Sequence, residues 1–441
     1  MAPNTPNGLA NQEPKAIFTR EEVFQHRKKD DCWIILEGEV YNVTPWLKKH
    51  PGGARVVLHY GGEDATIAWT SFHNDLNQVK KYLTAFHIGT LQDGKMTEID
   101  KDFLKLRSSL KEKGFFKPSV PFFIAHFLHI YFFFFATWGV LWYFGNTWAT
   151  WLIAAVFMTT CQAQSGWLQH DFGHLSVFNS SKLNHAVHDI TIGLMKGVSS
   201  WWWNYRHFQH HAKPNVHMKD PDITAPYLFL FGKVIPEKWG RRRLGIMPYR
   251  IQHLYFFFLG PPLLLPIYFH LEVLFYTFKR KLVKDFLLMV GFYLIFHFTF
   301  APLMGGFWGN FRWYFFIRFL ESHWFVWVTQ MSHLPMHVDT DKRDNWVSMQ
   351  LKGTTDVETS FLIDWFSGHL NFQIEHHLFP TMPRNQFAAV KPYVVEFCKK
   401  HDIKYHSKTF YDALADIVRS LKESSDIWAD AYDAHIPLKA D

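Results

Sequence analysis

Histidine is the residue type whose spacing in this sequence points most clearly to chemistry. Among the 27 histidines, three short motifs stand out, which read HDFGH, HFQHH and QIEHH. Their histidines are His170 and His174, then His207, His210 and His211, then His376 and His377. Positions i and i+4, or i, i+3 and i+4, lie on one face of a helix, so each motif can direct its imidazoles to one point. The three motifs together predict a metal site with nitrogen ligands.

The number of imidazoles bears on which metal is bound. One tetrahedral zinc ion cannot use so many nitrogen ligands, and zinc sites rarely need three separate helical clusters. A pair of iron ions fits better, although imidazole accommodates iron, zinc and copper alike. A single H-x-x-x-H pair is a weak signal, because such a pair in a membrane protein is often a hydrogen-bonded structural feature. The recurrence of the motif favours a pair of irons. That the metal is iron is inferred from the reaction that such a site must support.

A second chemical pattern lies near the N-terminus. His50 precedes the turn Pro51-Gly52-Gly53, and His73 follows further along the chain. Two imidazoles on opposing loops can bind a haem iron from both sides, and nearby apolar residues can contact the ring. The candidates for that contact are Val56, Val57, Leu58, Ile67 and Phe72. Such a haem has no open position, so it carries electrons and does not activate oxygen. A His-Pro-Gly-Gly turn alone could also simply end a helix.

The elements that position these groups change in character along the chain. Residues 1–95 have an ordinary soluble composition with short β-like segments between turns. Residues 96–120 form a charged, helical connector, and residues 121–441 contain long aromatic and apolar runs. We therefore expect an α+β haem domain followed by an all-α, multi-span membrane domain.

Four apolar runs are close to the roughly 20 residues that a bilayer core requires. They are residues 121–144, 147–166, 254–278 and 285–308. A further run, 311–331, contains several polar residues, so we expect an interfacial or protein-packed helix there. These residues are Arg312, Arg318, Glu321 and His323.

The distribution of basic residues predicts which parts face the cytosol. Residues 167–252 are polar and basic, and the excess of Lys and Arg favours the cytosolic side for this segment. With two spans before it and two after, the N-terminal domain and residues 330–441 lie on the same side. The polar N-terminus lacks the apolar core of a signal peptide, which agrees with this orientation. One group of basic residues conflicts with this orientation, because it lies between the third and fourth spans and would face the lumen. These residues are Lys279, Arg280, Lys281 and Lys284.

Composition excludes several classes of protein. The chain has 441 residues, of which 48% are hydrophobic and 18% aromatic, so it is not a disordered protein. Its three cysteines are far apart, which argues against a disulfide framework and a zinc ribbon. The net charge is +7, and the basic residues are interleaved with aromatic runs. That pattern suits a membrane lipid surface and not nucleic acid.

Two family resemblances follow from these motifs. The N-terminal part of the chain, residues 1–95, resembles the cytochrome b5 family. The matching residues are Trp33, 41–44 (YNVT), 50–53 (HPGG), 61–66 (GGEDAT) and His73. The whole chain is similar to membrane front-end fatty acyl desaturases fused to such a domain, through HDFGH, HFQHHAKPN and WFSGHLNFQIEHHLFP. Gln373 stands where many other membrane desaturases have a histidine, which is typical of the front-end group. The motifs are most like those of the animal delta-5 and delta-6 polyunsaturated acyl-CoA desaturases.

These resemblances imply a reaction and its cofactors. Front-end desaturases insert a cis double bond between an existing one and the carboxyl end of a polyunsaturated acyl chain, using O2. The implied cofactors are haem b, held by His50 and His73, and two non-haem irons. Electrons are expected from NADH through a separate cytochrome b5 reductase, since no nucleotide-binding signature opens a helix here. The implied location is the endoplasmic reticulum membrane.

The resemblance also adds candidate site residues. Related desaturases have a further iron-binding histidine before the last motif, and His333 occupies a similar place. His337 lies one turn further along, but Pro335 interrupts a regular helix there. His369 is either a residue that contacts a metal ligand without binding the metal itself or a structural histidine. Two carboxylates inside the motifs are expected to accept hydrogen bonds from ligand imidazoles, namely Asp171 and Glu375.

Several alternatives stay open at this stage. The same ligands suit a desaturase or hydroxylase acting on a sphingolipid base or a glycerolipid-bound chain. A different class is a non-enzymatic membrane haem electron carrier with structural histidines. Trp201, Trp202 and Trp203 either line the mouth of an acyl tunnel or belong to an interfacial aromatic belt. Basic residues either receive a CoA phosphate or meet lipid headgroups, and these are Lys213, Lys219 and 241–243.

Overall fold

The computed structural model describes residues 16–224, 228–340 and 345–434, and the chain divides into two compact units, 1–101 and 102–441. The polar N-terminal stretch that favoured a cytosolic start lies mostly outside the described residues. Each unit is built differently, in keeping with the change of composition.

The first unit is an α+β domain around one sheet. The strand order is β1-β5-β4-β3-β2, with β1 parallel to β5 and the other pairs antiparallel. The strands are β1 (Ala16–Phe18), β2 (Arg27–Lys28), β3 (Asp31–Leu36), β4 (Glu39–Asn42) and β5 (His87–Leu91). The helices are α1 (Arg20–Gln25), η1 (Thr44–Trp46), α2 (Ala54–Leu58), α3 (Thr66–Phe72), α4 (Leu76–Leu83) and η2 (Thr84–Phe86). A small core of Val23, Ile35, Val40 and Leu91 lies under the sheet.

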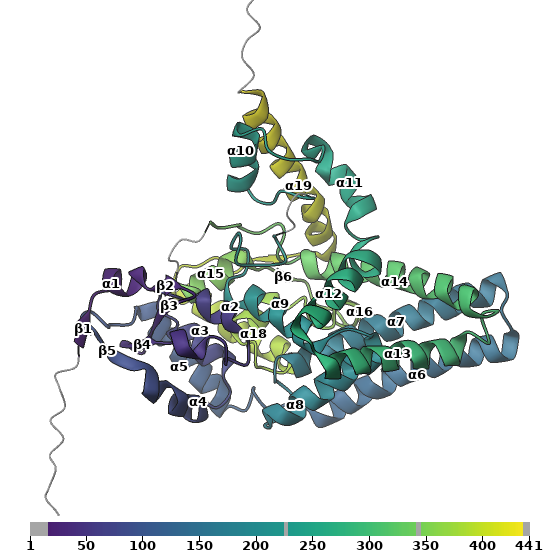
Figure 1. Ribbon diagram of the computed structural model, residues 1–441, viewed down its shortest axis with the longest axis horizontal. Coiled ribbons are helices and arrows are strands. Elements are labelled where there is room, and N and C mark those ends of the chain that lie inside the picture. The colour runs from purple at the N-terminus through teal and green to yellow at the C-terminus, as the bar shows by residue number, and fades with distance from the viewer. Residues whose placement is uncertain (1–15, 225–227, 341–344, 435–441) are drawn as a thin grey trace, which may run out of the picture. The chain divides into compact units, whose positions relative to one another are not determined.

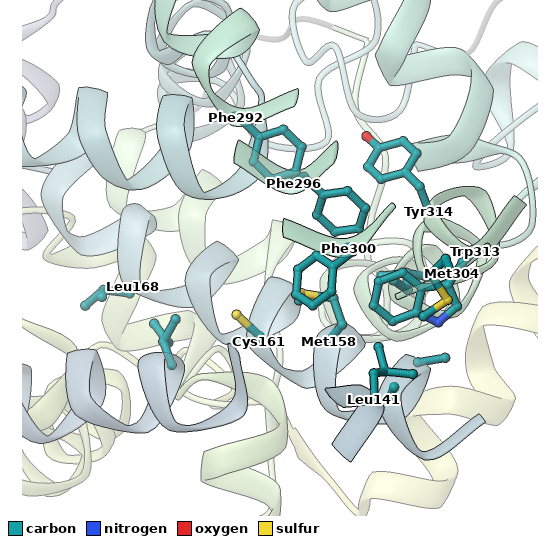
Figure 2. Close-up of a cluster of buried hydrophobic side chains, with 14 of the residues drawn as sticks. Leu141, Met158, Cys161, Leu168, Phe292, Phe296, Phe300, Met304, Trp313 and Tyr314 are labelled. Carbon is teal, nitrogen blue, oxygen red and sulfur yellow. The ribbon is translucent and has the colours of Figure 1, made fainter. Parts of the chain in front are cut away.

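The second unit is almost entirely helical, after the connecting helix α5 (Glu98–Glu112). Four long helices run side by side as a bundle (Figure 1): α6 (Val120–Phe144), α7 (Trp148–Gly173), α13 (Val283–Phe300) and α14 (Phe307–Gln330). Figure 2 shows their shared core, in which Phe292, Phe296 and Phe300 follow one face of α13 toward Trp313 and Tyr314 of α14. An α+β domain followed by a helical region with apolar helices confirms the predicted fold class.

Two helices of the described residues, α6 and α13, are each long and apolar enough to cross a membrane. A third candidate is a bent pair, Tyr249–Leu259 with Leu264–Arg280, whose halves meet at 75°. The sequence at the bend reads Gly260-Pro261-Pro262. Proline removes a helical hydrogen bond and clashes with the preceding turn, which accounts for the break.

The start of α13 packs against the polar segment that follows α7. The ammonium group of Lys284 contacts the Asp189 carboxylate at 2.5 Å, and the Ser199 hydroxyl donates to Asp285 at 2.5 Å. Asp189 and Ser199 belong to the segment that carries the second histidine motif. The basic loop before α13 therefore lies at the same end of the bundle as that motif, although the expected topology separated them.

The remaining elements of the second unit lie between α7 and α13 and after α14 in the chain. Between α7 and α13 lie α8 (Ser181–His188), η3 (Asp189–Leu194), α9 (Ser200–Ala212), α10 (Val234–Arg241), η4 (Tyr249–Ile251), α11 (Gln252–Leu259), η5 (Leu264–Phe269) and α12 (His270–Arg280). After α14 come α15 (Trp346–Gly353), β6 (Asp356–Val357), α16 (Phe361–Ser367), α17 (Gln373–Leu378), η6 (Arg384–Gln386), α18 (Phe387–Lys400), β7 (Ser407–Lys408) and α19 (Phe410–Asp433). In Figure 1, α10 and α11 pack along α19.

Candidate metal centre and haem pocket

Helix α9 carries the second motif, and its start is tightly fixed. The Ser199 hydroxyl accepts from the backbone N–H of Trp202 at 3.1 Å, as an N-cap does. Asp285 of α13 accepts from the backbone N–H of Trp201 at 3.2 Å and from Ser199. The negative charge of this buried carboxylate also suits the positive end of the helix dipole. The three histidines of α9 thus project from a helix whose N-terminus is held by α13.

The first and third motifs meet α9 from two other elements. His170 lies in the last turn of α7, and His174 caps the C-terminus of that helix. The short helix α17 carries His376 and His377, and its first turn is anchored where the Ile374 N–H donates to Asp356 at 3.0 Å.

All eight histidines predicted as metal ligands converge in two groups. One group is His170, His174, His207, His211 and His376, and the other is His210, His333 and His377. Within each group the ligand atoms lie within 4.8 Å of one another. His210 and His211 are neighbours on α9 but point into different groups, so the two groups adjoin.

The nitrogen spacing fits metal coordination. The Nε2 atom of His207 is 3.0 Å from that of His170 and 2.8 Å from that of His174, and the Nε2 atoms of His210 and His333 are 3.3 Å apart. Nitrogen ligands bonded at about 2.0–2.1 Å to one ion lie about 3 Å from each other. The Nε2 atoms of His376 and His377 are buried without a hydrogen-bond partner, as free ligand atoms would be. The residues therefore fit two metal ions.

Burial keeps most of these imidazoles neutral, which is the form that binds a metal. It lowers the pKa of His211, His376 and His377 well below the usual range, and neighbouring histidines lower it further. His210 is the exception. Burial would lower its pKa too, but the carboxylate of Asp220 outweighs that effect, and the pKa of His210 is raised.

Two apolar cavities adjoin the histidine groups. The larger, of about 500 Å³, is lined by His170, His207, His210 and His333 together with residues of α11, η5 and α14. The smaller, of about 130 Å³, leads from His207 between α7, α9, α12, α13 and α14. The two cavities share nine lining residues: Gly166, Trp167, Gln169, Trp203, Arg206, His207, Asp222, Phe269 and Phe325.

The first unit holds a separate pocket. Its volume is about 360 Å³, and His50 and His73 face each other across it with ring centroids 6.3 Å apart. The Nδ1–H of His73 donates to the Trp69 carbonyl at 2.8 Å, which leaves Nε2 free for a metal. Burial lowers the pKa of His50 to about 4. Of the predicted apolar walls, Val57 and Phe72 line the pocket, and a planar haem with two axial imidazoles fits this arrangement.

Residues 146–409 match the family model described as fatty acid desaturase. The chain belongs to the fatty acid desaturase family. In this desaturase, residues 19–92 also match the cytochrome b5-like haem/steroid binding domain, so the membrane domain is fused to an N-terminal cytochrome b5 domain. The cytochrome b5 domain implies haem, and the desaturase family implies a diiron centre.

Two solved structures are similar to part of the desaturase. Cytochrome b5 of Ostreococcus tauri virus 2 is 34% identical over 17% of this chain and 95% of its own, with a TM-score of 0.16. Cytochrome b558 of Ectothiorhodospira vacuolata, described as a prokaryotic homologue of cytochrome b5, is 35% identical over 18% of this chain and 99% of its own, with a TM-score of 0.17.

The partners that orient the imidazoles of the desaturase were not found from the sequence. The Nδ1 atoms of His210, His333 and His377 contact, respectively, Asp220 at 2.9 Å, the Gly353 carbonyl at 3.1 Å and the Gln350 amide oxygen at 2.8 Å. A hydrogen bond at Nδ1 fixes the tautomer and leaves Nε2 for the metal. The sequence offered one signal for such a partner, the acidic stretch Asp220-Pro221-Asp222 that closely follows the second motif.

The two carboxylates inside the motifs have other partners, so their predicted role was wrong. Asp171 forms a buried ion pair with Arg384, whose Nε lies 3.1 Å from Oδ2. Glu375 accepts from the Tyr405 hydroxyl at 2.9 Å. Asp171 and Glu375 are thus engaged by residues other than the ligand imidazoles. They hold the first and third motifs against the C-terminal part of the desaturase.

The three weaker candidates differ in position. The amide nitrogen of Gln373 is 2.6 Å from Nε2 of His333, so Gln373 lies at the edge of the second group. His337 has a side chain that is 65% exposed, and neither group includes it. His369 lies outside both groups as well, with its ring 5.6 Å from that of Phe122.

Proposed function

We propose that this desaturase is a front-end enzyme of the delta-5 or delta-6 type. It introduces a cis double bond between an existing double bond and the carboxyl end of a polyunsaturated acyl chain, supplied as the acyl-CoA. The observation that carries the proposal is the convergence of eight imidazoles at the junction of two apolar cavities. Gln373 beside His333, in place of a further histidine, supports the front-end assignment.

The ligand assignment follows the two groups. His170, His174, His207, His211 and His376 hold one iron, and His210, His333 and His377 hold the other, with Gln373 beside it. When bound, the iron pair supplies the activation of O2 that removal of hydrogen from an unactivated methylene pair requires. Asp220, Gln350 and the Gly353 carbonyl each contact Nδ1 of their histidine, so Nε2 is the nitrogen that remains for the metal.

The cavity walls position the acyl chain. Aromatic and aliphatic residues line the larger cavity, and the rings of Trp203 and His207 lie in tilted contact at the junction, with centroids 4.3 Å apart. Holding one carbon pair at the metal centre converts the reaction into an intramolecular one and excludes bulk water. Trp202 and Trp203 line the smaller cavity, which favours the tunnel over a purely interfacial role for them.

We infer a revised membrane topology. In this topology α7 and α14 cross together with α6 and α13, because all four helices share one apolar core. The bent α11–α12 pair, although apolar enough to span, lies at the cytosolic interface. The contacts of Lys284 and Asp285 with the segment after α7 support this, because they require the basic loop to share the side of the histidine motifs. The loop then obeys the positive-inside rule. The haem domain and the histidine motifs face the cytosol of the endoplasmic reticulum membrane.

Electrons are proposed to come from NADH through a separate cytochrome b5 reductase to the fused haem. Of the basic residues first considered for a CoA phosphate, Lys213 and Arg241 are poorly placed. Lys213 is buried, and Arg241 pairs with Glu237 on α10, away from the residues that line either cavity. The headgroup of the substrate is therefore expected outside the larger cavity.

Expression in yeast fed single polyunsaturated fatty acids tests the proposal. Products are identified by double-bond position, and His210→Ala and His50→Ala are run beside the native chain. A new double bond on the carboxyl side of an existing one, lost in both variants, is the expected result. A hydroxylated lipid or a desaturated sphingoid base would refute the substrate assignment and leave the metal site standing.

A further inference from the structure

The larger cavity reaches the surface of the protein through apolar side chains. Among the described residues that line it, four are exposed, and all four are aliphatic or aromatic. They are Leu228, Ile267, Tyr268 and Leu271, with exposed fractions of 41%, 48%, 43% and 63%. A side chain that both lines a cavity and is exposed lies where the cavity opens. Three of them follow closely on η5 and the start of α12, and these three, Ile267, Tyr268 and Leu271, are here called the mouth.

The mouth lies beside the segment that follows α9. The Arg206 guanidinium donates through Nη1 to both oxygens of Glu272, at 2.9 and 3.0 Å, and Glu272 directly follows Leu271. Through Nη2 it donates to the Pro221 carbonyl and to Asp222, both at 3.0 Å. Arg206, Pro221 and Asp222 line the larger cavity as well. These charge-assisted bonds hold the start of α12, and the mouth with it, against the segment that follows α9.

The surface next to the mouth is also apolar. Positions i, i+3, i+4 and i+7 share one face of a helix, and on α12 these positions are Leu271, Leu274, Phe275 and Phe278. All four side chains are exposed. A helix face of exposed, large apolar side chains is typical of a surface that contacts lipid. This agrees with the interfacial position inferred above for the bent α11–α12 pair.

The same cavity extends to the metal centre. His170, His207, His210 and His333 line it, so one space joins these imidazoles with the mouth. An acyl chain dissolved in a membrane would have to leave hydrocarbon in order to approach the site through water, and the hydrophobic effect opposes that step. A path through the mouth keeps the chain in apolar surroundings between the bilayer and the histidines.

We propose that the acyl chain enters the larger cavity sideways from the membrane, through the mouth formed by Ile267, Tyr268 and Leu271. The inference rests on the proposed acyl desaturation and adds the route by which the chain reaches the metal centre. The headgroup then stays at the membrane surface, outside the cavity.

Cysteines placed at the mouth test the route. The three native cysteines are all buried, so an introduced thiol is the exposed target. Leu271→Cys puts this thiol at the mouth, and Ile267→Cys is a second probe there. Phe275→Cys is the matched control, because it lies one turn further along the same face, is 64% exposed and lines neither cavity.

The first measurement is protection by the substrate. The full-length protein in lipid nanodiscs is treated with an alkyl maleimide without NADH or reductase, so a polyunsaturated acyl-CoA binds but is not consumed. With the acyl-CoA at about ten times its Kd, labelling of Leu271→Cys and Ile267→Cys should slow about tenfold. Labelling of Phe275→Cys should not change.

The second measurement reports which phase the mouth faces. Relative to a free thiol in water, Leu271→Cys should prefer the alkyl maleimide over a charged, membrane-impermeant maleimide by about tenfold or more. The third blocks the mouth with a bulky reagent that forms a mixed disulfide. This should remove most of the desaturation by Leu271→Cys, reduction of the disulfide should restore it, and Phe275→Cys should stay active throughout.

Three outcomes would overturn the route while the desaturase assignment stood. One is equal labelling of both mouth variants with and without an acyl-CoA that the enzyme desaturates; if one variant fails to accumulate, the other decides. Another is a preference of Leu271→Cys for the charged reagent, which would place the mouth in water. The last is full activity of Leu271→Cys when blocked. A native enzyme that converts no acyl-CoA would instead overturn the proposed function, and the route with it.

Discussion

The carboxylate behind His210 offers a direct test of how the second iron is held. Asp220 is fully buried, and its Oδ2 accepts from Nδ1 of His210 at 2.9 Å and from the Asn215 N–H at 2.8 Å. Its Oδ1 accepts from the Asp222 N–H at 2.8 Å. Asp220→Asn keeps the shape of the side chain but replaces one carboxylate oxygen with an NH2 group, which cannot accept a hydrogen bond. In either orientation of the amide, this NH2 group faces an N–H donor that the carboxylate oxygen accepted.

The expected cost follows from this geometry. Loss of an outer partner of a ligand histidine weakens metal binding or activity about 10–100-fold. At about 1.4 kcal/mol per factor of ten, this is about 1.4–2.8 kcal/mol. In Asp220→Asn, the iron bound by His210, His333 and His377 should be lost first, while the haem is retained.

Iron per haem in the purified full-length protein, measured across a chelator titration, checks the prediction. The native chain should hold two non-haem irons per haem, and Asp220→Asn should fall to one at a chelator concentration that leaves the native chain intact. Asp222→Asn is the control, because its Oδ2 is 3.7 Å from Nδ1 of His210 and its side chain is 33% exposed. It should keep both irons. An Asp220→Asn protein that retains both irons to the same chelator concentration as the native chain would refute the reasoning.

Three further outcomes are expected. Gln350→Leu keeps the packing but removes the acceptor at His377 Nδ1, so desaturation should fall about 10–100-fold with haem content unchanged, as product analysis and the haem absorbance will report. His50→Ala should abolish the haem absorbance and leave the non-haem iron bound, and an iron assay that shows joint loss would contradict independent sites. Gly173→Ala would place a methyl group 2.2 Å from the ring of Trp203, so the free energy of unfolding should fall by about 1–3 kcal/mol, and an unchanged melting temperature would count against the packing described.

The sequence was sufficient to predict which histidines gather in the two groups but not which residues orient them. Ligand imidazoles recur at helical spacing, so His207, His210 and His211 could be read as one face of a helix. Gln350 and the Gly353 carbonyl reach their histidines across loops, and no local pattern marks them. For the same reason the role of Asp171 was predicted wrongly, because its partner Arg384 lies on an element far away in the sequence.

Membrane topology stays a prediction for a related reason. Hydropathy counts apolar residues over a window, and the segment 254–278 is apolar enough to qualify as a span. The signal against a straight span was the Gly260-Pro261-Pro262 break, together with the basic loop that conflicted with the expected side. Arg318 and Glu321 predicted an interfacial or protein-packed helix at 311–331, and their ion pair inside the bundle agrees with the packed alternative.

The cap on α9 ties the metal centre to the order in which the chain is made. Asp285 is translated long after the helix whose N-terminus it caps, and it reaches Ser199 and Trp201 once α13 has packed against the segment after α7. The third motif and His333 are made later still. Each group also takes one histidine from α17, His376 in the first group and His377 in the second. Neither group of imidazoles is therefore complete until this late part of the chain has been made and has folded.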